Sequence, residues 1–434
     1  MLKYNRMDKK LVQRTIFPEI LAHLGKSEIT VIVGPRQTGK TTLVNQLKEK
    51  LLSDQKISTE QIFYFNLDVV SDRRIFITQE DFIRFVNNHT FKDRLIYIFV
   101  DEAQRIHEAG LFFKGVYDLN LPVKLVLTGS SSLEIKSKIA EPLTGRKKLF
   151  TLLPFDFEEY LNFYNPNLIS FLSSEDSYSV SKIMEVLYRF MIHGGYPKVS
   201  LTTNGVEQEG YLEEIFTSYL EKDVVSLAKI KDQYAFSKFV KIIAQEMGNL
   251  FNADKTSQEL GIKTETVKRY LDILEKTFVV KRIAPYFKSA RAEIRKMPKI
   301  YYVDSGLRNY TLEGRGFSEP NFLSRNDKGA LLEDFVFCEL IKKGINDLNF
   351  WRTKDGAEVD FIVPVAGDII PVEVKAVNLS DGELTRSFVS FVGKYQPKIA
   401  VIVNLNTQMV RKLGPTEVHY ILPYQIASFL SDNI

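Results

Sequence analysis

The hydrophobic positions in the first third of the chain fall in short β-branched runs separated by helical stripes. Four apolar runs have the length and composition of buried strands. Alternation of strands with helical segments predicts an α/β fold, a parallel sheet with helices on both faces. Ligands of such sheets bind beyond the carboxyl ends of the strands. The predicted strands are residues 29–33, 62–67, 95–100 and 123–127.

Helical periodicity dominates the middle of the chain. Residues 155–230 carry Tyr, Phe and Leu at helical spacing, which predicts a helical lid. An apolar stripe over residues 236–243 then begins a three-helix pattern. Thr256-Ser-Gln-Glu259 has the form of a capping box and predicts the start of a short helix that ends at Gly261. Thr264 begins the next helix, and two short helices joined by a glycine turn are typical of a helix-turn-helix.

The last part of the chain alternates again between strands and helices. Strands at 278–283 and 299–303 flank a basic loop, which resembles the wing of a winged helix. A helix over 331–342 and several further strands predict a small α/β domain. We therefore divide the chain into an α/β domain (1–152), a helical lid or connector (153–230), a winged-helix domain (231–311) and a small C-terminal domain (328–434). The strands predicted in that last domain are residues 348–351, 357–363, 369–377 and 399–403.

The first predicted strand runs directly into a phosphate-binding loop. Two glycines separated by four residues are followed by a Lys-Thr pair that opens a helix. In this motif the backbone N–H groups cradle phosphate oxygens at a helix N-terminus, and the lysine neutralises the β- and γ-phosphates. The threonine after the lysine ligates Mg²⁺. The residues expected to contact the nucleotide are Gly34, Pro35, Arg36, Gln37, Thr38, Gly39, Lys40, Thr41 and Thr42.

Polar residues follow two further predicted strands. Asp101 and Glu102 end the apolar run 95–100. Coupled to the phosphate loop, Asp101 is expected to hold Mg²⁺ and Glu102 to orient and deprotonate the attacking water. Thr128 ends the next strand, where its hydroxyl either senses the γ-phosphate or caps a turn.

Basic residues gather on the predicted helix-turn-helix and on the wing. Clusters of this kind are the footprint of phosphate contacts with DNA. The alternatives are a winged helix that contacts proteins and a basic hairpin that is only solvated. The candidate DNA-binding residues are Lys263, Lys268 and Arg269 on the helices, and Lys288, Arg291, Arg295 and Lys296 in the wing.

The C-terminal domain carries Asp360 followed by Glu373-Val-Lys375 on two predicted strands. Residues i and i+2 share a face of a strand, and antiparallel pairing brings Asp360 beside them. Two carboxylates, completed by Glu333 from the preceding helix, then hold Mg²⁺ or Mn²⁺, and Lys375 activates water for phosphodiester hydrolysis. The order and types of these residues resemble the PD-(D/E)XK nuclease superfamily. Alternating charge on a half-exposed strand is the alternative interpretation.

Composition excludes several classes of protein. The 434 residues are 44% hydrophobic with a net charge of +4, which permits a nucleic-acid partner without requiring one. A single cysteine, Cys338, excludes an internal disulfide and fits a reducing cytoplasm. Neither a signal-peptide core nor an apolar run of transmembrane length is present, so we expect a cytoplasmic protein without a membrane partner.

Several motifs together resemble prokaryotic AAA-type ATPases that carry a C-terminal domain of unknown function. The resemblance covers nearly the whole chain and implies binding and hydrolysis of ATP. It also suggests Arg146 as a phosphate-sensing or finger arginine, acting in cis or from a second copy in a homo-oligomer, although Arg146 could equally be surface charge. The motifs are the phosphate loop, Val100-Asp-Glu-Ala-Gln104, Leu127-Thr-Gly-Ser-Ser131, Thr144-Gly-Arg146, Leu153-Pro-Phe-Asp-Phe-Glu158 and His193-Gly-Gly-Tyr-Pro197.

These observations lead to one main hypothesis and two alternatives. The first is an ATPase, cycling between ATP and ADP, that engages DNA through the winged helix and carries a metal-dependent nuclease-like site. The second is a nucleotide-controlled switch that binds DNA or protein and whose nuclease-like domain is inactive. The third is an ATPase that acts on proteins, which would show no salt-dependent affinity for nucleic acid.

Overall fold

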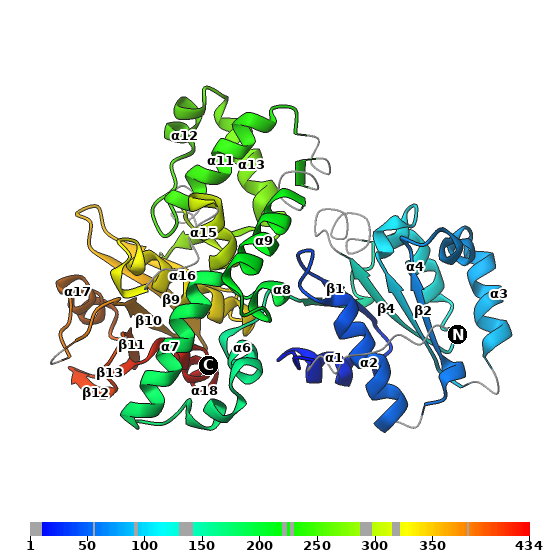
Figure 1. Ribbon diagram of the computed structural model, residues 1–434, viewed down its shortest axis with the longest axis horizontal. Helices are drawn as coiled ribbons and strands as arrows, with labels where there is room; N and C mark the ends of the chain where they lie inside the picture. The colour runs from blue at the N-terminus through cyan, green and yellow to red at the C-terminus, as the bar shows by residue number, and fades with distance from the viewer. Residues whose placement is uncertain are drawn as a thin grey trace. The chain divides into compact units, whose positions relative to one another are not determined.

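The computed structural model describes residues 11–54, 57–90, 94–129, 142–218, 224–225, 230–286, 297–314, 322–379 and 382–434. The chain divides into two compact units, each described by itself below (Figure 1). The N-terminal unit comprises residues 13–154 with 276–278. The C-terminal unit comprises the described residues among 11–12, 155–275 and 279–434.

The N-terminal unit is built on a five-stranded sheet in the order β2-β3-β4-β1-β5. All neighbouring strands are parallel, as the sequence predicts. The four predicted strands are present within two residues at either end, and β5 is an additional strand. The strands are β1 Ile29–Val33, β2 Ile62–Asn66, β3 Ile96–Asp101, β4 Val123–Gly129 and β5 Lys147–Thr151. The helices are α1 Phe17–His23, α2 Lys40–Asp54, α3 Gln79–His89 and α4 Ala109–Asp118.

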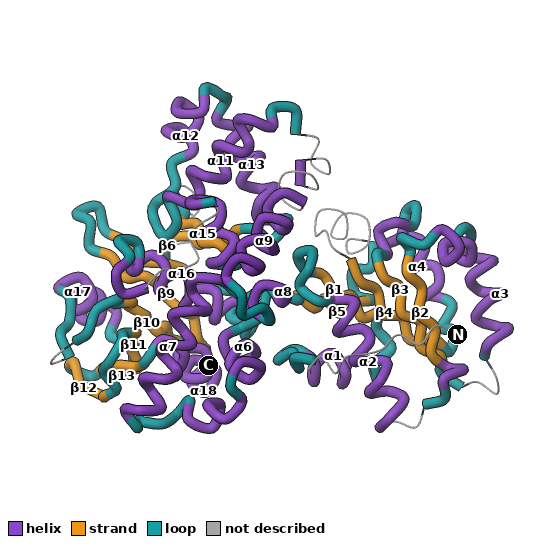
Figure 2. Tube along the Cα trace, viewed as in Figure 1, coloured by secondary structure: helices purple, strands orange, loops and turns teal. Residues whose placement is uncertain are grey.

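Helices cover both faces of this sheet (Figure 2). Side chains alternate along β3, so that Ile98 packs in one core with α3 and α4, while Phe99 packs in the other with α1 and α2. A strand buried on both faces reads as the continuous apolar run seen in the sequence. Because the sheet is parallel, β1 and β3 both end at the edge where the phosphate loop and Asp101 lie.

The C-terminal unit combines helices with an eight-stranded mixed sheet in the order β12-β13-β11-β10-β9-β8-β6-β7. Among the described residues, no helix is long and apolar enough to cross a membrane. The helices are α6 Phe157–Tyr164, α7 Ser177–His193, α8 Pro197–Ser200, α9 Gly205–Ile215, α11 Gln233–Gln245, α12 Ala253–Leu260, α13 Thr264–Lys276, α15 Ser305–Glu313, α16 Lys328–Lys342, α17 Arg386–Tyr395 and α18 Ile426–Asn433. The strands are β6 Val280–Pro285, β7 Lys299–Tyr302, β8 Asn349–Arg352, β9 Glu358–Val365, β10 Asp368–Val374, β11 Ile399–Val403, β12 Met409–Leu413 and β13 Thr416–Ile421.

The two strands expected to form the wing of a separate domain belong to the large sheet of the C-terminal unit. β6 and β7 do form an antiparallel pair, but β6 also pairs in parallel with β8. The hairpin is therefore the end of the C-terminal sheet and not part of a separate domain. This pairing joins segments about 65 residues apart (Ala284 with Asn349), which no local pattern reveals.

The helix-turn-helix segment also corrects one prediction. The helix expected to start with a capping box at Thr256 starts earlier, as α12 at Ala253, because the Asn252 side chain accepts hydrogen bonds from the first backbone N–H groups. Its end is as predicted, since Gly261 is left-handed with φ +66°. The next helix, α13, begins at Thr264, whose hydroxyl bonds Asp254 of α12 at 2.9 Å and so fixes the turn.

A glycine junction joins the end of α7 to the start of α15. The Asp304 carboxylate caps α15 through Leu307 N–H (2.9 Å) and accepts the Gly195 N–H (2.7 Å). A Cβ added at Gly306 would lie 2.0 Å from the carbonyl oxygen of His193, so no larger residue fits there without displacing backbone. The motif His193-Gly-Gly is therefore a packing feature of the C-terminal unit, and Asp304 is its anchor.

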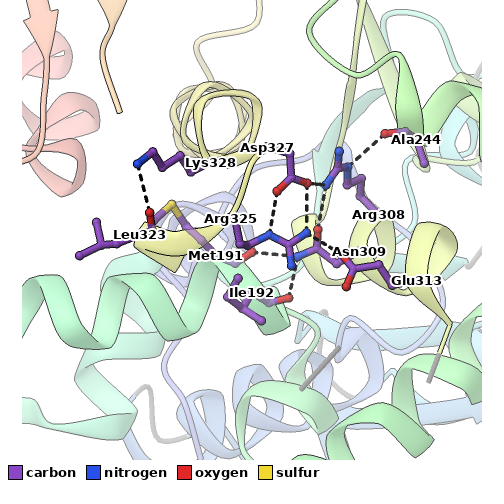
Figure 3. A network of polar contacts seen from close by, with 10 residues as sticks. All are labelled: Met191, Ile192, Ala244, Arg308, Asn309, Glu313, Leu323, Arg325, Asp327 and Lys328. Atoms are coloured by element: carbon purple, nitrogen blue, oxygen red, sulfur yellow. Dashed lines mark hydrogen bonds and ion pairs between the residues drawn. The ribbon is translucent and has the colours of Figure 1, made fainter. Parts of the chain in front are cut away.

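A buried ion-pair network holds α15 against α7, α11 and the start of α16 (Figure 3). Arg308 is 3% exposed, donates to the Ala244 carbonyl at 3.1 Å and pairs with Asp327. Arg325 makes a two-pronged contact with the same carboxylate, at 2.8 and 3.0 Å. Burial raises the pKa of Asp327, but the two arginines outweigh it and lower that pKa to about 2.

Candidate functional site

The phosphate loop between β1 and α2 has the geometry that the motif requires. Gly34 has φ +156°, and a Cβ there would lie 2.1 Å from the carbonyl oxygen of Leu152, the residue that follows β5. Gly39 is also left-handed, at φ +91°. Gln37 adopts φ +64°, which is strained for a residue with a side chain. The loop thus curls tightly before α2 begins at Lys40.

Hydrogen bonds fix the loop from within. The Lys40 ammonium donates to the carbonyls of Gly34 (3.0 Å) and Pro35 (2.7 Å), and the Thr38 hydroxyl donates to the Pro35 carbonyl. The buried Arg14 donates to the Thr38 carbonyl at 2.9 Å and to the Leu153 carbonyl. The loop is therefore held in shape by its own residues and by Arg14. Of the remaining loop residues, Arg36, Thr41 and Thr42 are exposed.

Lys40 is buried with an unusual pKa. Burial lowers the pKa of its ammonium, and the carboxylates of Glu102 and Asp101 offset only part of this, so that the pKa is about 8. An ammonium at the helix N-terminus is well placed to contact an anion bound in the loop. Such an anion would raise the pKa of Lys40 and favour its charged form.

Three hydroxyl groups converge on Asp101 at the end of β3. Thr41 donates to Oδ2 at 2.8 Å, Tyr64 donates to the same oxygen at 2.9 Å, and Thr128 donates to Oδ1. Burial and the neighbouring Asp101 raise the pKa of Tyr64, so the phenol keeps its proton and remains a donor. The two oxygens expected to ligate Mg²⁺, from Thr41 and Asp101, therefore lie side by side, and this donor set fits a hard cation.

Glu102 lies next to this cluster in a left-handed conformation, with φ +56°. Gln104, two residues later and buried, donates its side-chain N–H to the Glu102 carboxylate. A non-glycine residue held at positive φ costs energy and is found preferentially at functional sites. The carboxylate expected to orient water is thus positioned by Gln104.

Arg146 precedes β5 and forms an ion pair with Asp118 at the end of α4. Its Nε and Nη2 atoms lie 2.7 and 3.2 Å from the two carboxylate oxygens. The guanidinium is about one-third exposed. To reach a phosphate it would have to leave Asp118, and its catalytic role remains a prediction.

The basic residues expected to contact DNA are only partly described. Lys263, Lys268 and Arg269 are exposed at the turn and on α13, whose Val267 and Tyr270 pack inward. The four wing residues Lys288, Arg291, Arg295 and Lys296 lie outside the described residues.

The predicted nuclease-like residues come together in the C-terminal unit. β9 and β10 are antiparallel, and Asp360 accepts the backbone N–H of Val374 at 2.7 Å. Lys375 Nζ lies 2.7 Å from Glu373 Oε1 on the same side of the strand. Burial, with the nearby Glu333 and Glu373, raises the pKa of Asp360 well above its usual value, although Lys299 and the Val374 N–H oppose the shift.

An unexpected lysine lies among these acids. Lys299 Nζ, on β7, is 2.9 Å from Glu333 Oε1, 2.5 Å from Glu358 Oε1 and 4.0 Å from Asp360 Oδ1. The Tyr301 hydroxyl also donates to Glu333. In the described ranges, no three or more His, Cys, Asp or Glu side chains are placed to hold a metal ion. A divalent metal held by Glu333, Asp360 and Glu373 does not fit this arrangement, because an ammonium already contacts Glu333 and approaches Asp360.

Comparisons with known proteins match three segments of the chain to domain families. Residues 26–161 match the family model of an AAA domain. Residues 184–318 and 328–426 match models of two domains of unknown function, DUF8612 and DUF4143. The chain therefore carries an AAA-type nucleotide-binding domain, followed by two domains whose families have no assigned function.

Relatives and solved structures add little about activity. An uncharacterized protein of Haemophilus influenzae is 26% identical over 377 residues, covering 85% of this chain and 88% of that protein. An uncharacterized protein of Mycobacterium tuberculosis is 26% identical over 81% of this chain and 71% of its own length. Among solved structures, the Aeropyrum pernix ORC1 protein in complex with DNA covers 67% of this chain and 90% of its own, at 11% identity and a TM-score of 0.29. The match to AMPPCP-bound DnaA from Aquifex aeolicus covers 60% of this chain and 84% of that chain, at 14% identity and a TM-score of 0.29.

Proposed function

We propose that this protein is an ATP-hydrolysing ATPase that engages DNA under the control of its nucleotide. The observation that carries the ATPase part is the contact of Thr41 and Thr128 with Asp101, beside the buried Lys40. ATP phosphates would bind at the loop and the start of α2. Thr41 and Asp101 would hold Mg²⁺, which neutralises phosphate charge when bound, and Glu102 would orient and deprotonate the attacking water.

ATP affinity is expected to fall as the pH rises above about 8, the pKa of Lys40. Below that pH, Lys40 is already charged and binds phosphate directly. Above it, Lys40 is neutral, so binding must first add a proton, and affinity falls by up to about tenfold per pH unit. Binding of a fluorescent ATP analogue measured from pH 7 to 9.5 tests this. Lys40→Ala should bind weakly at every pH, and a flat profile in the unsubstituted protein would contradict the assignment.

The DNA-binding part rests on the charge around α13. Lys263 is exposed in the turn before α13, and Lys268 and Arg269 are exposed in its N-terminal half together with one acid, Glu265. The acids at the other end, Asp272 and Glu275, are paired with Arg282 of β6. Three cations are thus exposed at or near the turn, as expected of a recognition helix that meets phosphates.

Replacing Lys268 and Arg269 by alanine should weaken binding to DNA, by about the same factor for every DNA sequence. Each lost phosphate contact should reduce the slope of log affinity against log salt by about 1. Fluorescence anisotropy with duplex DNA at several salt concentrations measures both quantities. Lys182→Ala, which removes an exposed lysine paired with Glu185 on α7, is the matched control and should change neither. Unchanged affinity in the double variant would favour a protein partner instead.

For the C-terminal unit, a nuclease-like fold remains our proposal, and one observation favours the inactive alternative. The order Glu333, Asp360, Glu373, Lys375 and the antiparallel β9–β10 pair support the fold. The ammonium of Lys299 between Glu333 and Glu358 supports a domain that does not cleave in this arrangement. The resulting second candidate function is a nucleotide-controlled DNA-binding switch.

A further inference from the structure

Lys299 is the most completely enclosed charge of the acidic site. Its side chain is 2% exposed, at the start of β7 on the edge of the sheet. The ammonium contacts Glu333 of α16 and Glu358 of β9, and Asp360 lies just beyond at 4.0 Å. A buried lysine is tolerated where carboxylates compensate its charge. The lysine and the acids therefore depend on one another.

The other charges of the site are also countered by side chains. Lys375 contacts Glu373 at 2.7 Å, and Arg352 pairs with the second oxygen of Glu358. Thr385 adds a hydrogen bond to Glu373 Oε1 at 3.1 Å. One acceptor is left over, because Glu373 Oε2 is buried and no described residue donates a hydrogen bond to it. The site thus keeps an oxygen of the kind that ligates metals, although three cationic side chains already contact its acids.

We propose that the Lys299 ammonium serves as the resident cation of the acidic site and keeps divalent metal ions out of it. The inference rests on the proposed nuclease-like fold. Metal-dependent cleavage then requires that β7 withdraw its lysine.

Two physical reasons support exclusion. Mg²⁺ and Mn²⁺ need several oxygen ligands at close range, and Lys299 already occupies Glu333 and Glu358. A divalent ion beside the retained ammonium would also be repelled by a positive charge in a poorly solvated site. Moving Lys299 out would leave the carboxylates uncompensated until a metal replaced it. Lysine and metal are therefore expected to be mutually exclusive.

Mn²⁺ binding to the full chain without nucleotide, followed by electron paramagnetic resonance, tests the proposal. The wild type should show no site that depends on Asp360. Lys299→Met leaves an unbranched side chain that is one atom shorter and removes its charge, so it should gain one Mn²⁺ site with an affinity higher by roughly tenfold or more. That site should disappear when Asp360→Asn is added. Lys281→Met, which removes a half-buried lysine on the same hairpin whose ammonium donates to Asn346, is the matched control.

The outcomes separate this inference from the proposed function. Mn²⁺ binding by the wild type that Asp360→Asn abolishes would overturn the inference, and this measurement does not depend on whether the Lys299 variant folds. A folded Lys299→Met protein, checked by circular dichroism, that still binds no Mn²⁺ would overturn it as well. DNA cleavage is scored separately. A variant that gains metal but never cuts DNA would support the inference and contradict nuclease activity.

Discussion

Replacing Glu102 by glutamine is expected to lower the ATP turnover number about 10²- to 10⁴-fold, the contribution typical of a general base. Glutamine keeps the size of the side chain and its contact with Gln104 but does not accept the proton of the attacking water. Lys40, Thr41 and Asp101 are unchanged, so ATP affinity should remain within a few-fold of the wild type. Steady-state phosphate release and equilibrium binding of an ATP analogue measure the two effects.

Glu108→Gln supplies a matched control for this experiment. Glu108 lies six residues further along the same segment, is exposed and also adopts a left-handed conformation, with φ +48°. Its substitution should leave turnover unchanged. Equal turnover in Glu102→Gln and Glu108→Gln would show that the catalytic base lies elsewhere.

Replacing Asp327 by alanine is expected to destabilise the C-terminal unit by about 3 to 5 kcal/mol, because it leaves the buried Arg308 without its carboxylate. The network in Figure 3 would lose the acid that joins Arg308 to Arg325. Differential scanning calorimetry should show a lower melting temperature for the transition of this unit. Glu185→Ala, which breaks an exposed pair with Lys182, should change stability by less than about 1 kcal/mol.

The same carboxylate should make stability depend on acidity. The pKa of Asp327 is lowered to about 2 in the folded chain, from an ordinary value of 3.8. A lowered pKa means that the stabilisation is complete above pH 3.8 and is lost as the pH falls toward 2. The difference in melting temperature between wild type and Asp327→Ala should therefore narrow between pH 4 and pH 2. A constant difference over that range would contradict the ion-pair account.

Local patterns predicted the N-terminal unit well. Its central strands are continuous apolar runs, and the phosphate loop, Asp101 and Thr128 lie at the carboxyl ends of strands, so sequence position fixes their spatial position. The contribution of Tyr64 was missed. It reaches Asp101 from β2, and nothing in the sequence around Tyr64 distinguishes it from a core aromatic residue. Gln104 belongs to a motif noted in the sequence. Its hydrogen bond to Glu102 could not be predicted, because it depends on the left-handed backbone conformation of Glu102.

The C-terminal unit was harder because its important contacts are long-range. The pairing of β9 with β10 follows from a short turn and was expected, whereas the pairing of β6 with β8 joins distant segments. Lys299 was read as the first residue of a wing strand. Its contacts with Glu333 and Glu358 depend on that distant pairing, and no spacing rule connects them. The capping box at Thr256 was outcompeted locally by Asn252, a stronger N-cap residue.

Because one sheet contains both the β6–β7 hairpin and the C-terminal strands, these two segments are expected to be inherited together. The two matched models of unknown function end and begin between β7 and β8, at residues 318 and 328. Yet β6 bonds to β8, and Lys299 of the first segment is enclosed by acids of the second. Separating the two segments at that boundary would leave the edge of β6 unpaired and would deprive the buried Lys299 ammonium of its carboxylate partners. The two segments are therefore expected to be inherited together, as a single structural module.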